Sequence, residues 1–493
     1  MTEIMLYSML FVIFAGLLLG YPVAFVLAGV SLLFAFLGSA MDVFDISFLN
    51  ALPNRIYGIM LNELLLAVPL FIFMGVTLER AKIAEDLLET MSALFGTLRG
   101  GLGISVLIVG ALLAASTGIV GATVVTMGLI SLPSMIKAGY CPRISSGTIC
   151  AAGTLGQIIP PSIVLILLGD QISSAWQTTQ MRHGITATAP VTIADLFVAA
   201  LLPGALLVGC YLTWLILNAL FCAKKLPAMK SEERTRIMGN KGFMCVCKVL
   251  FPPLFLIAIV LGSILLGFAT ATESAAVGAV GALLLAFQRK ALSLENLRGI
   301  VQCTTKVTCM VFTILIGATV FTLVFRGYGG EDVIHGILSS LPGGLLGAML
   351  VTMLVMFLLG FFLDFIEIIF VVVPIVAPIL LGMGADPIWL AIMMAINLQT
   401  SFLTPPFGFG LFYLRGVAPK EVATGSIYRG ALPFVAIQVI VLGLIATTPA
   451  IATWLPHKFY GTNIQTLDPS AIQTEAPEVL DKDGNRPSWL IDF

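Results

Sequence analysis

The chain has 493 residues, of which 59% are hydrophobic and only 10% are charged, and its formal net charge is −1. Soluble domains carry about 25% charged residues, so this composition excludes an ordinary soluble protein. The balanced charge, without a basic patch, argues against nucleic-acid binding. The scattered cysteines and the three histidines argue against a metal or redox site. Apolar stretches of the ~20 residues that a membrane-spanning helix needs recur throughout, so we expect an all-α polytopic protein of the inner membrane.

Residues 1–221 are predicted to form a first membrane repeat. The apolar run 103–136 is too long for one simple helix and carries Thr117-Gly118 near its middle, which predicts a re-entrant helical hairpin. The run 148–169 contains Pro160-Pro161. Because proline removes a helical donor and clashes with the preceding turn, we expect a broken helix there. The polar stretch 170–192 is predicted to be an insertion that forms a surface loop.

The segment 79–99 differs from the apolar runs around it. Its apolar residues recur near i, i+4 and i+8 spacing, and charged residues take much of the opposite face. This pattern is typical of a helix that lies in the membrane interface. It is equally typical of a connecting helix packed on the protein, so both interpretations stay open.

Residues 222–248 form the most basic segment of the chain, which is expected on the cytoplasmic side by the positive-inside rule. Residues 249–455 are predicted to form a second membrane repeat, with a hairpin at about 343–382 and a broken helix at about 388–413. The tail 456–493 is polar, and we expect it to be flexible or loosely docked.

Prolines show that the two repeats correspond. Pro160-Pro161 returns 245 residues later as Pro405-Pro406, and Pro133 and Pro142 have proline partners at the same shift. A fixed shift of this kind indicates two copies of one unit. A helix break that is doubled at membrane depth is where transporters place their binding sites.

The chemistry of the breaks favours a cation and an organic anion. Unpaired backbone groups are costly in hydrocarbon, so carbonyls freed by a double proline must bond to protein, water or a cation. Glycines permit unwinding, and hydroxyl and carbonyl oxygens suit Na⁺. One break alone is compatible with a structural kink, whereas two symmetric breaks favour binding. The candidates are Gly153, Thr154, Gly156, Pro160, Pro161 and Ser162 at the first break and Thr400, Thr404, Pro405, Pro406 and Gly408 at the second.

The hairpin tips add further candidates. Helix N-termini at a tip present free N–H groups and a partial positive charge, which favour an anion. At the second tip, Asp364 and Glu367 share a helix face, and ionisable groups inside a membrane are usually functional. Asp364 is the candidate acid near a cation, unless it reaches water at the interface. Glu273 either caps a helix or binds directly. These candidates are Ser116, Thr117, Gly118, Thr123, Thr272, Glu273, Gly360 and Asp364.

At these residues the chain resembles the large membrane subunit of TRAP transporters, the tripartite ATP-independent periplasmic carriers. The resemblance covers about 1–455 and rests on the order and spacing of short motifs. The insertion after Asp170 and the long tail are similar to the mannitol/chloroaromatic-type branch. The motifs are Gly20-Tyr21-Pro22, Val68-Pro69-Leu70-Phe71, Gly100-Gly101, Gly139-Tyr140, Ile159-Pro160-Pro161-Ser162, Thr272-Glu273, Leu363-Asp364 and Leu403-Thr404-Pro405-Pro406.

This resemblance implies two inverted repeats of the ion-transporter superfamily type and sodium-coupled uptake of an organic acid by an elevator movement. It implies two partners, a small four-helix membrane subunit and a periplasmic solute-binding protein, and no cofactor besides Na⁺ as coupling ion. The family often has Ser-Gly-Ser-Ser at the first tip, where this chain has Thr117-Gly118-Ile119-Val120, so Na⁺ would depend there on Thr117 and backbone carbonyls. The Na⁺ ions are expected near Thr117, Gly156, Pro160, Asp364, Thr404 and Pro405.

Two other functions are alternatives to a TRAP permease for a membrane protein of this kind. A stand-alone ion-coupled carboxylate carrier would have the same breaks and hairpins, and would lack the two partners. An intramembrane enzyme would need a nucleophile–base pair or a metal motif within the spans. The sequence has no His-Glu-x-x-His motif, so we expect a transporter rather than an enzyme.

Overall fold

The computed structural model describes residues 1–118, 120–184, 190–228, 242–405 and 407–461, with the backbone alone for 115–117, 223 and 242–248. Every regular element in these ranges is a helix, which confirms the predicted all-α fold. Within them, six helices are long and apolar enough to span a membrane, or eight if each of two bent pairs is one span.

The first half of the chain runs from α1 to α10 and includes three short 3₁₀ turns. Its elements are α1 (Thr2–Leu18), α2 (Val23–Ala40), η1 (Ile46–Ala51), α3 (Leu52–Met60), η2 (Glu63–Leu66), α4 (Ala67–Arg80), α5 (Ile83–Phe95), α6 (Gly101–Thr117), α7 (Val120–Lys137), α8 (Pro142–Thr154), η3 (Leu155–Gln157), α9 (Ile163–Arg182) and α10 (Ile193–Phe221).

The second half follows the basic segment and runs from α12 to α22. Its elements are α12 (Gly242–Leu265), α13 (Ala271–Gln288), α14 (Leu294–Gly327), α15 (Gly330–Ser339), α16 (Leu345–Leu359), α17 (Phe365–Val371), α18 (Val373–Gly382), α19 (Pro387–Leu403), α20 (Phe409–Val417), α21 (Thr424–Thr447) and α22 (Ala450–Tyr460).

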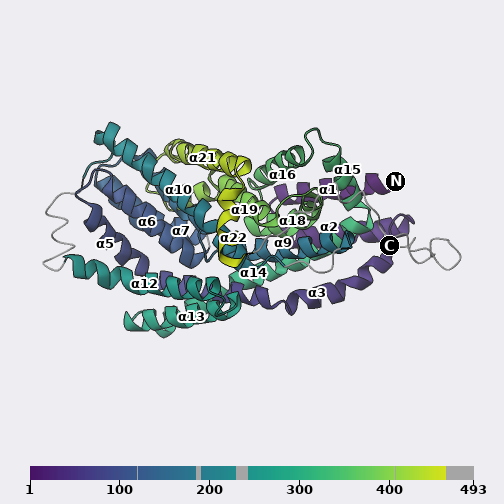
Figure 1. Ribbon diagram of the computed structural model, residues 1–493, viewed down its shortest axis with the longest axis horizontal. Coiled ribbons are helices and arrows are strands. Elements are labelled where there is room, and N and C mark those ends of the chain that lie inside the picture. The colour runs from purple at the N-terminus through teal and green to yellow at the C-terminus, as the bar shows by residue number, and fades with distance from the viewer. Residues whose placement is uncertain (119, 185–189, 229–241, 406, 462–493) are drawn as a thin grey trace.

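The two halves repeat the same order of elements. α1 and α2 correspond to α12 and α13, and the hairpin α6–α7 corresponds to α16–α18. The broken helix α8–α9 corresponds to α19–α20, and α10 corresponds to α21. In Figure 1, α5, α6 and α7 lie at the left and α15, α16 and α18 at the right, with α19 and α22 between them. The structure therefore has a hairpin and a broken helix in each half.

The two halves are interlocked rather than side by side. α14 of the second half packs along α2 of the first, and α13 packs along α4. The broken helices are exchanged in the same way, because α9 packs on α18 and α20 packs on α7. Each half therefore completes its packing with helices from the other.

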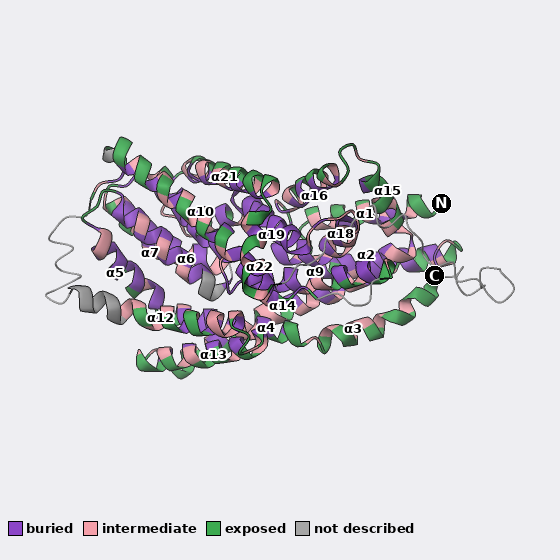
Figure 2. Ribbon diagram, in the orientation of Figure 1, coloured by how far each residue is buried: buried purple, intermediate pink, exposed green. Residues whose placement is uncertain are grey.

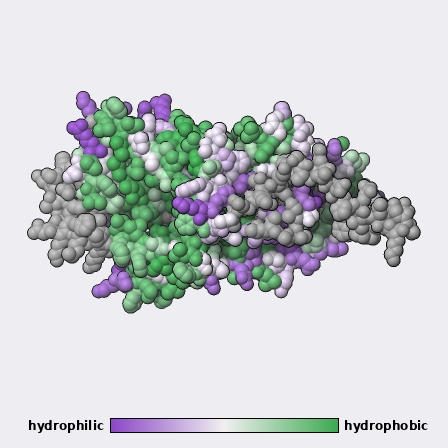
Figure 3. All heavy atoms as spheres, viewed as in Figure 1, coloured by the Kyte–Doolittle hydropathy of each residue, from purple (hydrophilic) through white to green (hydrophobic). Residues whose placement is uncertain are grey.

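Burial is highest in the middle of the molecule. Every residue of α19 is buried, as expected for a helix that is apolar on all sides. Figure 2 shows this burial in α9, α18 and α19 and exposed residues along α3 and α13. Apolar side chains such as Phe221 of α10 and Phe251 of α12 are exposed, and Figure 3 shows hydrophobic residues over much of the left half of this face. Such a surface suits a lipid environment.

The second hairpin has a bend that the sequence analysis did not predict. α17 and α18 meet at an angle of 55° around Val372, whereas α7 continues through Pro133 to Lys137. Pro374 accounts for the difference, because a proline clashes with the carbonyl four residues before it. The position 245 residues earlier is Leu129, so the first hairpin lacks this second proline.

The predicted surface loop after Asp170 is wrong for most of its length. Residues 170–182 continue α9 as helix, and 185–189 lie outside the described residues. Ile172, Trp176 and Thr179 are buried at helical spacing, while polar residues between them face other directions. The mean hydropathy of the segment is low because only one face of the helix is apolar. That one face is enough to pack against the protein, so the segment is helical although it is polar overall.

Three other segments can now be placed. α5 buries Leu87, Leu88 and Met91 and packs mainly on α6 and α12, which favours the connecting helix over the interfacial one. In the basic segment, the backbone of Lys225 and Leu226 bonds to the base of the first hairpin, and 229–241 lie outside the described residues. The tail begins within α22, and 462–493 lie outside the described residues.

Candidate functional site

The first break separates α8 from α9 at 158–162. No backbone N–H of the described chain donates to the carbonyls of Ile158, Ile159, Pro160 or Pro161, because these residues lie between η3 and α9, which starts only at Ile163. The Ser162 hydroxyl donates to the Gln157 carbonyl at 2.9 Å and caps α9. The break therefore presents a run of backbone oxygens without a backbone donor in the described chain.

The second break separates α19 from α20 at 404–408. The hydroxyls of Thr400 and Thr404 donate to carbonyls one turn earlier, each at 2.8 Å. A Cβ at Gly408 would lie 2.7 Å from the carbonyl oxygen of Phe402 and 2.8 Å from that of Thr404, so only glycine fits. Pro406 lies outside the described residues. Both hydroxyls are engaged with their own helix, and their lone pairs stay available to a cation.

The first tip lies directly on the first break. Gly118 ends α6 with a left-handed φ of 61°, and a Cβ there would lie 2.9 Å from the Ile163 side chain. A Cβ at Gly156 would lie 2.7 Å from the Ala114 carbonyl oxygen of α6. The side chains of Ser116 and Thr117 lie outside the described residues, and Thr123 is buried one turn into α7. Gly153 and Thr154 end α8 and are also buried.

The second tip lies on α19 and carries two acids. Asp364 accepts from the Phe365 N–H at 2.7 Å, and Glu367 accepts from the Asp364 N–H at 3.0 Å, which forms a capping box at α17. A Cβ at Gly360 would collide with the Ser401 side chain. A carboxylate has about four acceptor positions, so the capping box leaves Asp364 with capacity for a cation.

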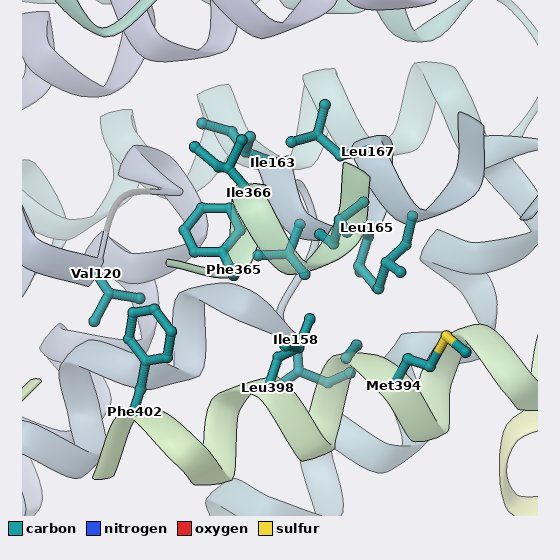
Figure 4. Close-up of a cluster of buried hydrophobic side chains, with 14 of the residues drawn as sticks. Val120, Ile158, Ile163, Leu165, Leu167, Phe365, Ile366, Met394, Leu398 and Phe402 are labelled. Atoms are coloured by element: carbon teal, nitrogen blue, oxygen red, sulfur yellow. The ribbon is translucent and has the colours of Figure 1, made fainter. Parts of the chain in front are cut away.

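The tips and breaks of both halves converge. Figure 4 shows Val120 of the first tip beside Phe402 of α19, and Ile366 of the second tip beside Ile163, the first residue of α9. The rings of Phe365 and Phe402 are 6.1 Å apart. A Cβ at Gly121 would lie 3.0 Å from the Tyr413 ring of α20. The four pieces that the sequence analysis predicted separately therefore surround one centre.

Two glutamines at this centre were not among the predicted site residues. Gln157 precedes the first break and Gln399 precedes the second, and both are fully buried. Neither end of either amide has a hydrogen-bond partner among the described residues. A buried polar group without a partner costs about 1–3 kcal/mol, so four such atoms favour a bound solute or ion. Glutamine inside an apolar run was the signal that could have found them.

Thr272 and Glu273 do not join this centre. The Thr272 hydroxyl donates to the Glu63 carbonyl at 2.8 Å. Glu273 is exposed and forms a capping box with Thr270 at the start of α13. In the described chain α13 packs chiefly on α4, α12 and η2. Of the two interpretations of Glu273, the structure therefore favours the helix cap, because the pattern after Gly267 starts a helix away from this centre.

The donor set at the centre defines its chemistry. It consists of backbone carbonyls, hydroxyls, two amides and the two partly buried carboxylates of Asp364 and Glu367. The described residues contain no group of three or more His, Cys, Asp or Glu side chains that could hold a metal. Hard oxygen ligands of this kind suit a weakly held alkali cation, and amide N–H groups suit a carboxylate.

The chain is similar to known proteins over most of its length. Residues 10–451 match the family described as "Tripartite ATP-independent periplasmic transporter, DctM component". A C4-dicarboxylate TRAP transporter large permease protein of Pseudomonas aeruginosa is 30% identical over 80% of this chain and 86% of its own length. Its counterpart in Vibrio cholerae is 29% identical over 93% and 99%. A sialic acid TRAP transporter large permease protein of Vibrio cholerae is 26% identical over 90% and 96%.

A solved structure shares the fold. The YdaH transporter of Alcanivorax borkumensis, described as having an unusual topology, covers 83% of this chain and 88% of its own, with a TM-score of 0.56 at 14% identity. The family match spans nearly all of the membrane helices. The chain therefore belongs to the DctM family of tripartite ATP-independent periplasmic transporters, as a multi-pass protein of the bacterial inner membrane.

Proposed function

We propose that this chain is the permease subunit through which an organic acid enters the cell together with Na⁺. A periplasmic binding protein delivers the acid, and a small membrane subunit completes the complex. The observation that supports this most strongly is the convergence of two helix breaks and two hairpin tips on one centre with free backbone oxygens. Relatives named for C4-dicarboxylates and for sialic acid support a carboxylate as substrate.

Na⁺ and the acid would be held by different donors. Carbonyls of the first break with Gly156 and Thr117, and Asp364 with Thr404 and Pro405, are the proposed Na⁺ ligands. Gln157 and Gln399 would then offer N–H groups to the carboxylate of the acid. Binding of the cation beside the anion would lower the electrostatic cost of moving either through the membrane, which is a physical basis for coupling.

The packing also suggests which parts move. The pairs α2–α14 and α4–α13 link the two halves and would form the static frame. The hairpins and broken helices share one buried core around α19 and would move as one body. This division is that of an elevator, in which the site crosses the membrane inside the moving body.

Uptake by the reconstituted complex tests the proposal. The chain, its small subunit and its binding protein would be assembled in proteoliposomes and supplied with labelled succinate, malate, lactate or sialic acid. We expect uptake of at least one acid, dependent on an inward Na⁺ gradient and on the binding protein. Equal uptake without Na⁺ would refute the coupling, and full uptake without the binding protein would favour a stand-alone carrier.

A further inference from the structure

A polar cleft with a volume of about 380 Å³ lies between the frame and the moving body. One wall comes from α3 and α14, and the other from α9 and the bent pair α17–α18. Its charged lining residues are Arg55, Asp170 and Arg326, and its remaining polar lining consists of hydroxyls and amides from both walls. Its volume falls within the range of about 300–1,000 Å³ that small-molecule sites occupy.

The negative charges at this cleft already have partners. Asp170 accepts from the side chains of Asn62 at 2.8 Å and Gln171 at 2.9 Å. Glu331, next to the cleft, is paired with Arg326 at 2.5 Å and with Arg182 at 3.2 Å. The two carboxylates therefore lie beside three guanidinium groups, those of Arg55, Arg182 and Arg326, which leaves one positive charge in excess.

Arg55 is the cationic side chain at the cleft that has no partner among the described residues. It is half-buried on α3 and makes no hydrogen bond or ion pair with any residue that the structure describes. Arg326, on the neighbouring helix α14, lines the same cleft and is close enough to repel it. An anion between the two guanidinium groups would remove the repulsion. A carboxylate has two oxygens that can accept from a guanidinium in a bidentate pair.

The cleft is close to the candidate site along two helices. Asp170 lies eight residues beyond Ser162 on α9, which is about 12 Å at 1.5 Å per residue. Phe370, which also lines the cleft, lies six residues beyond Asp364, or about 9 Å. An acid held in the cleft would therefore be about two helical turns from both the first break and the second tip.

The cleft opens on the side that faces a delivering protein. α9 ends at Arg182, and α10 then runs 29 residues to the basic segment, which is long enough to cross the membrane. The end of α9 and the basic segment thus lie on opposite faces. Because the basic segment is cytoplasmic by the positive-inside rule, Arg182 and the cleft are on the periplasmic side.

We propose that this cleft is a periplasmic access site for the carboxylate of the transported acid, with Arg55 and Arg326 as its cationic partners. The proposal rests on the proposed function, since its occupant is the acid that the complex takes up. The hydroxyl and amide groups of α9 would bind the rest of the acid, and the acid would move from there to the centre between the breaks.

Substitution of Arg55 tests the access site. In the proteoliposome assay with labelled succinate, malate, lactate and sialic acid, Arg55→Gln should raise the KM of each transported acid at least about tenfold. The maximal rate and the Na⁺ dependence should stay unchanged. Arg55→Lys should give an intermediate KM. Arg99→Gln is the matched control, since Arg99 is exposed between α5 and α6 and should have no effect.

A second pair of variants covers the possibility that Arg55→Gln does not fold. Ser174 is exposed and lines the cleft, so Ser174→Phe should fill it and raise the KM. Gln177 is exposed on the same helix outside the lining, so Gln177→Phe should not. Equal KM values for test and control variants would overturn the access site while uptake persists. If the unmodified complex took up no acid, the proposed function itself would fail.

Discussion

The two hairpin tips occupy corresponding places in the two halves and are built from different chemistry. The first tip turns at Gly118 and offers hydroxyl and backbone groups, with no acid on it. The second tip turns at Gly360 and carries Asp364 and Glu367 in a capping box. The same architecture therefore surrounds the centre with an acidic contributor on one side only. Internal symmetry of the fold does not require two equivalent ion sites.

Removal of the charge at the second tip should have the largest effect. Asp364→Asn keeps a side chain that can cap α17 and removes its negative charge. We expect Na⁺-dependent uptake to fall at least about tenfold, which corresponds to about 1.4 kcal/mol of lost ion binding. Initial rates at a series of Na⁺ concentrations measure this loss.

Asp386→Asn is the matched control, because Asp386 caps α19 by accepting from the Trp389 N–H at 2.8 Å. It should leave uptake unchanged. If Asp364→Asn transports normally and only Asp364→Ala loses stability, Asp364 is a helix cap and the proposed asymmetry between the tips disappears.

The two buried glutamines should give a smaller loss, of about threefold to tenfold in uptake, or roughly 0.7–1.4 kcal/mol. Gln157→Leu and Gln399→Leu remove amides that have no partner in the described chain. Because an apolar side chain removes the cost of the unpaired groups, the melting temperature should stay the same or rise. A lower melting temperature with unchanged uptake would show that the amides serve the fold instead.

Alanine substitutions of the two tip glycines compare the stability lost through backbone strain with the stability lost through crowding. Gly118→Ala places a Cβ at a left-handed φ of 61° and next to Ile163, so we expect a loss of about 1–3 kcal/mol in the free energy of unfolding. Gly360→Ala keeps an ordinary helical φ but places a Cβ 2.6 Å from the Cβ of Ser401, so we expect a loss of at least similar size that comes from crowding alone. Thermal unfolding in detergent measures both, with Gly209→Ala, which has open space around it, as the control. A loss at Gly360 much smaller than the loss at Gly118 would contradict this expectation.

The smallest effect is expected at the acid that caps α13. Glu273 is exposed in a capping box with Thr270, so Glu273→Gln should change uptake by no more than about twofold. The same transport assay that is used for Asp364 measures it. A loss of uptake as large as that of Asp364→Asn would show that Glu273 takes part in binding.

The comparison of Glu273 with Asp364 also shows where prediction from the sequence ends. Both acids lie in capping boxes that begin a helix shortly after a glycine, and the local patterns do not distinguish them. One helix starts on the periphery against α4, and the other starts against α19. That difference is decided by tertiary packing, which a local motif does not encode.

Other features divide in the same way. The hairpins and breaks were predictable because proline and glycine act within one turn of the chain. The continuation of α9 past Asp170 was not predictable from local sequence. Its apolar residues pack against the protein, and its polar residues line a cleft, and both depend on helices that are distant in sequence. Gln157 and Gln399 were also not predicted. They are fully buried because helices of both halves surround them, and the hydropathy of a single segment does not report this.

The interlocking of α2 with α14 has a consequence for biogenesis. α2 ends at Ala40 and α14 begins at Leu294, so the ribosome must add roughly 250 residues before α2 can meet its partner. At about 5–20 residues per second, this interval lasts on the order of 10–50 s. During it, the first half is inserted in the membrane with one flank of α2 uncovered, and a nascent chain arrested before α14 offers that flank to insertion factors and membrane proteases.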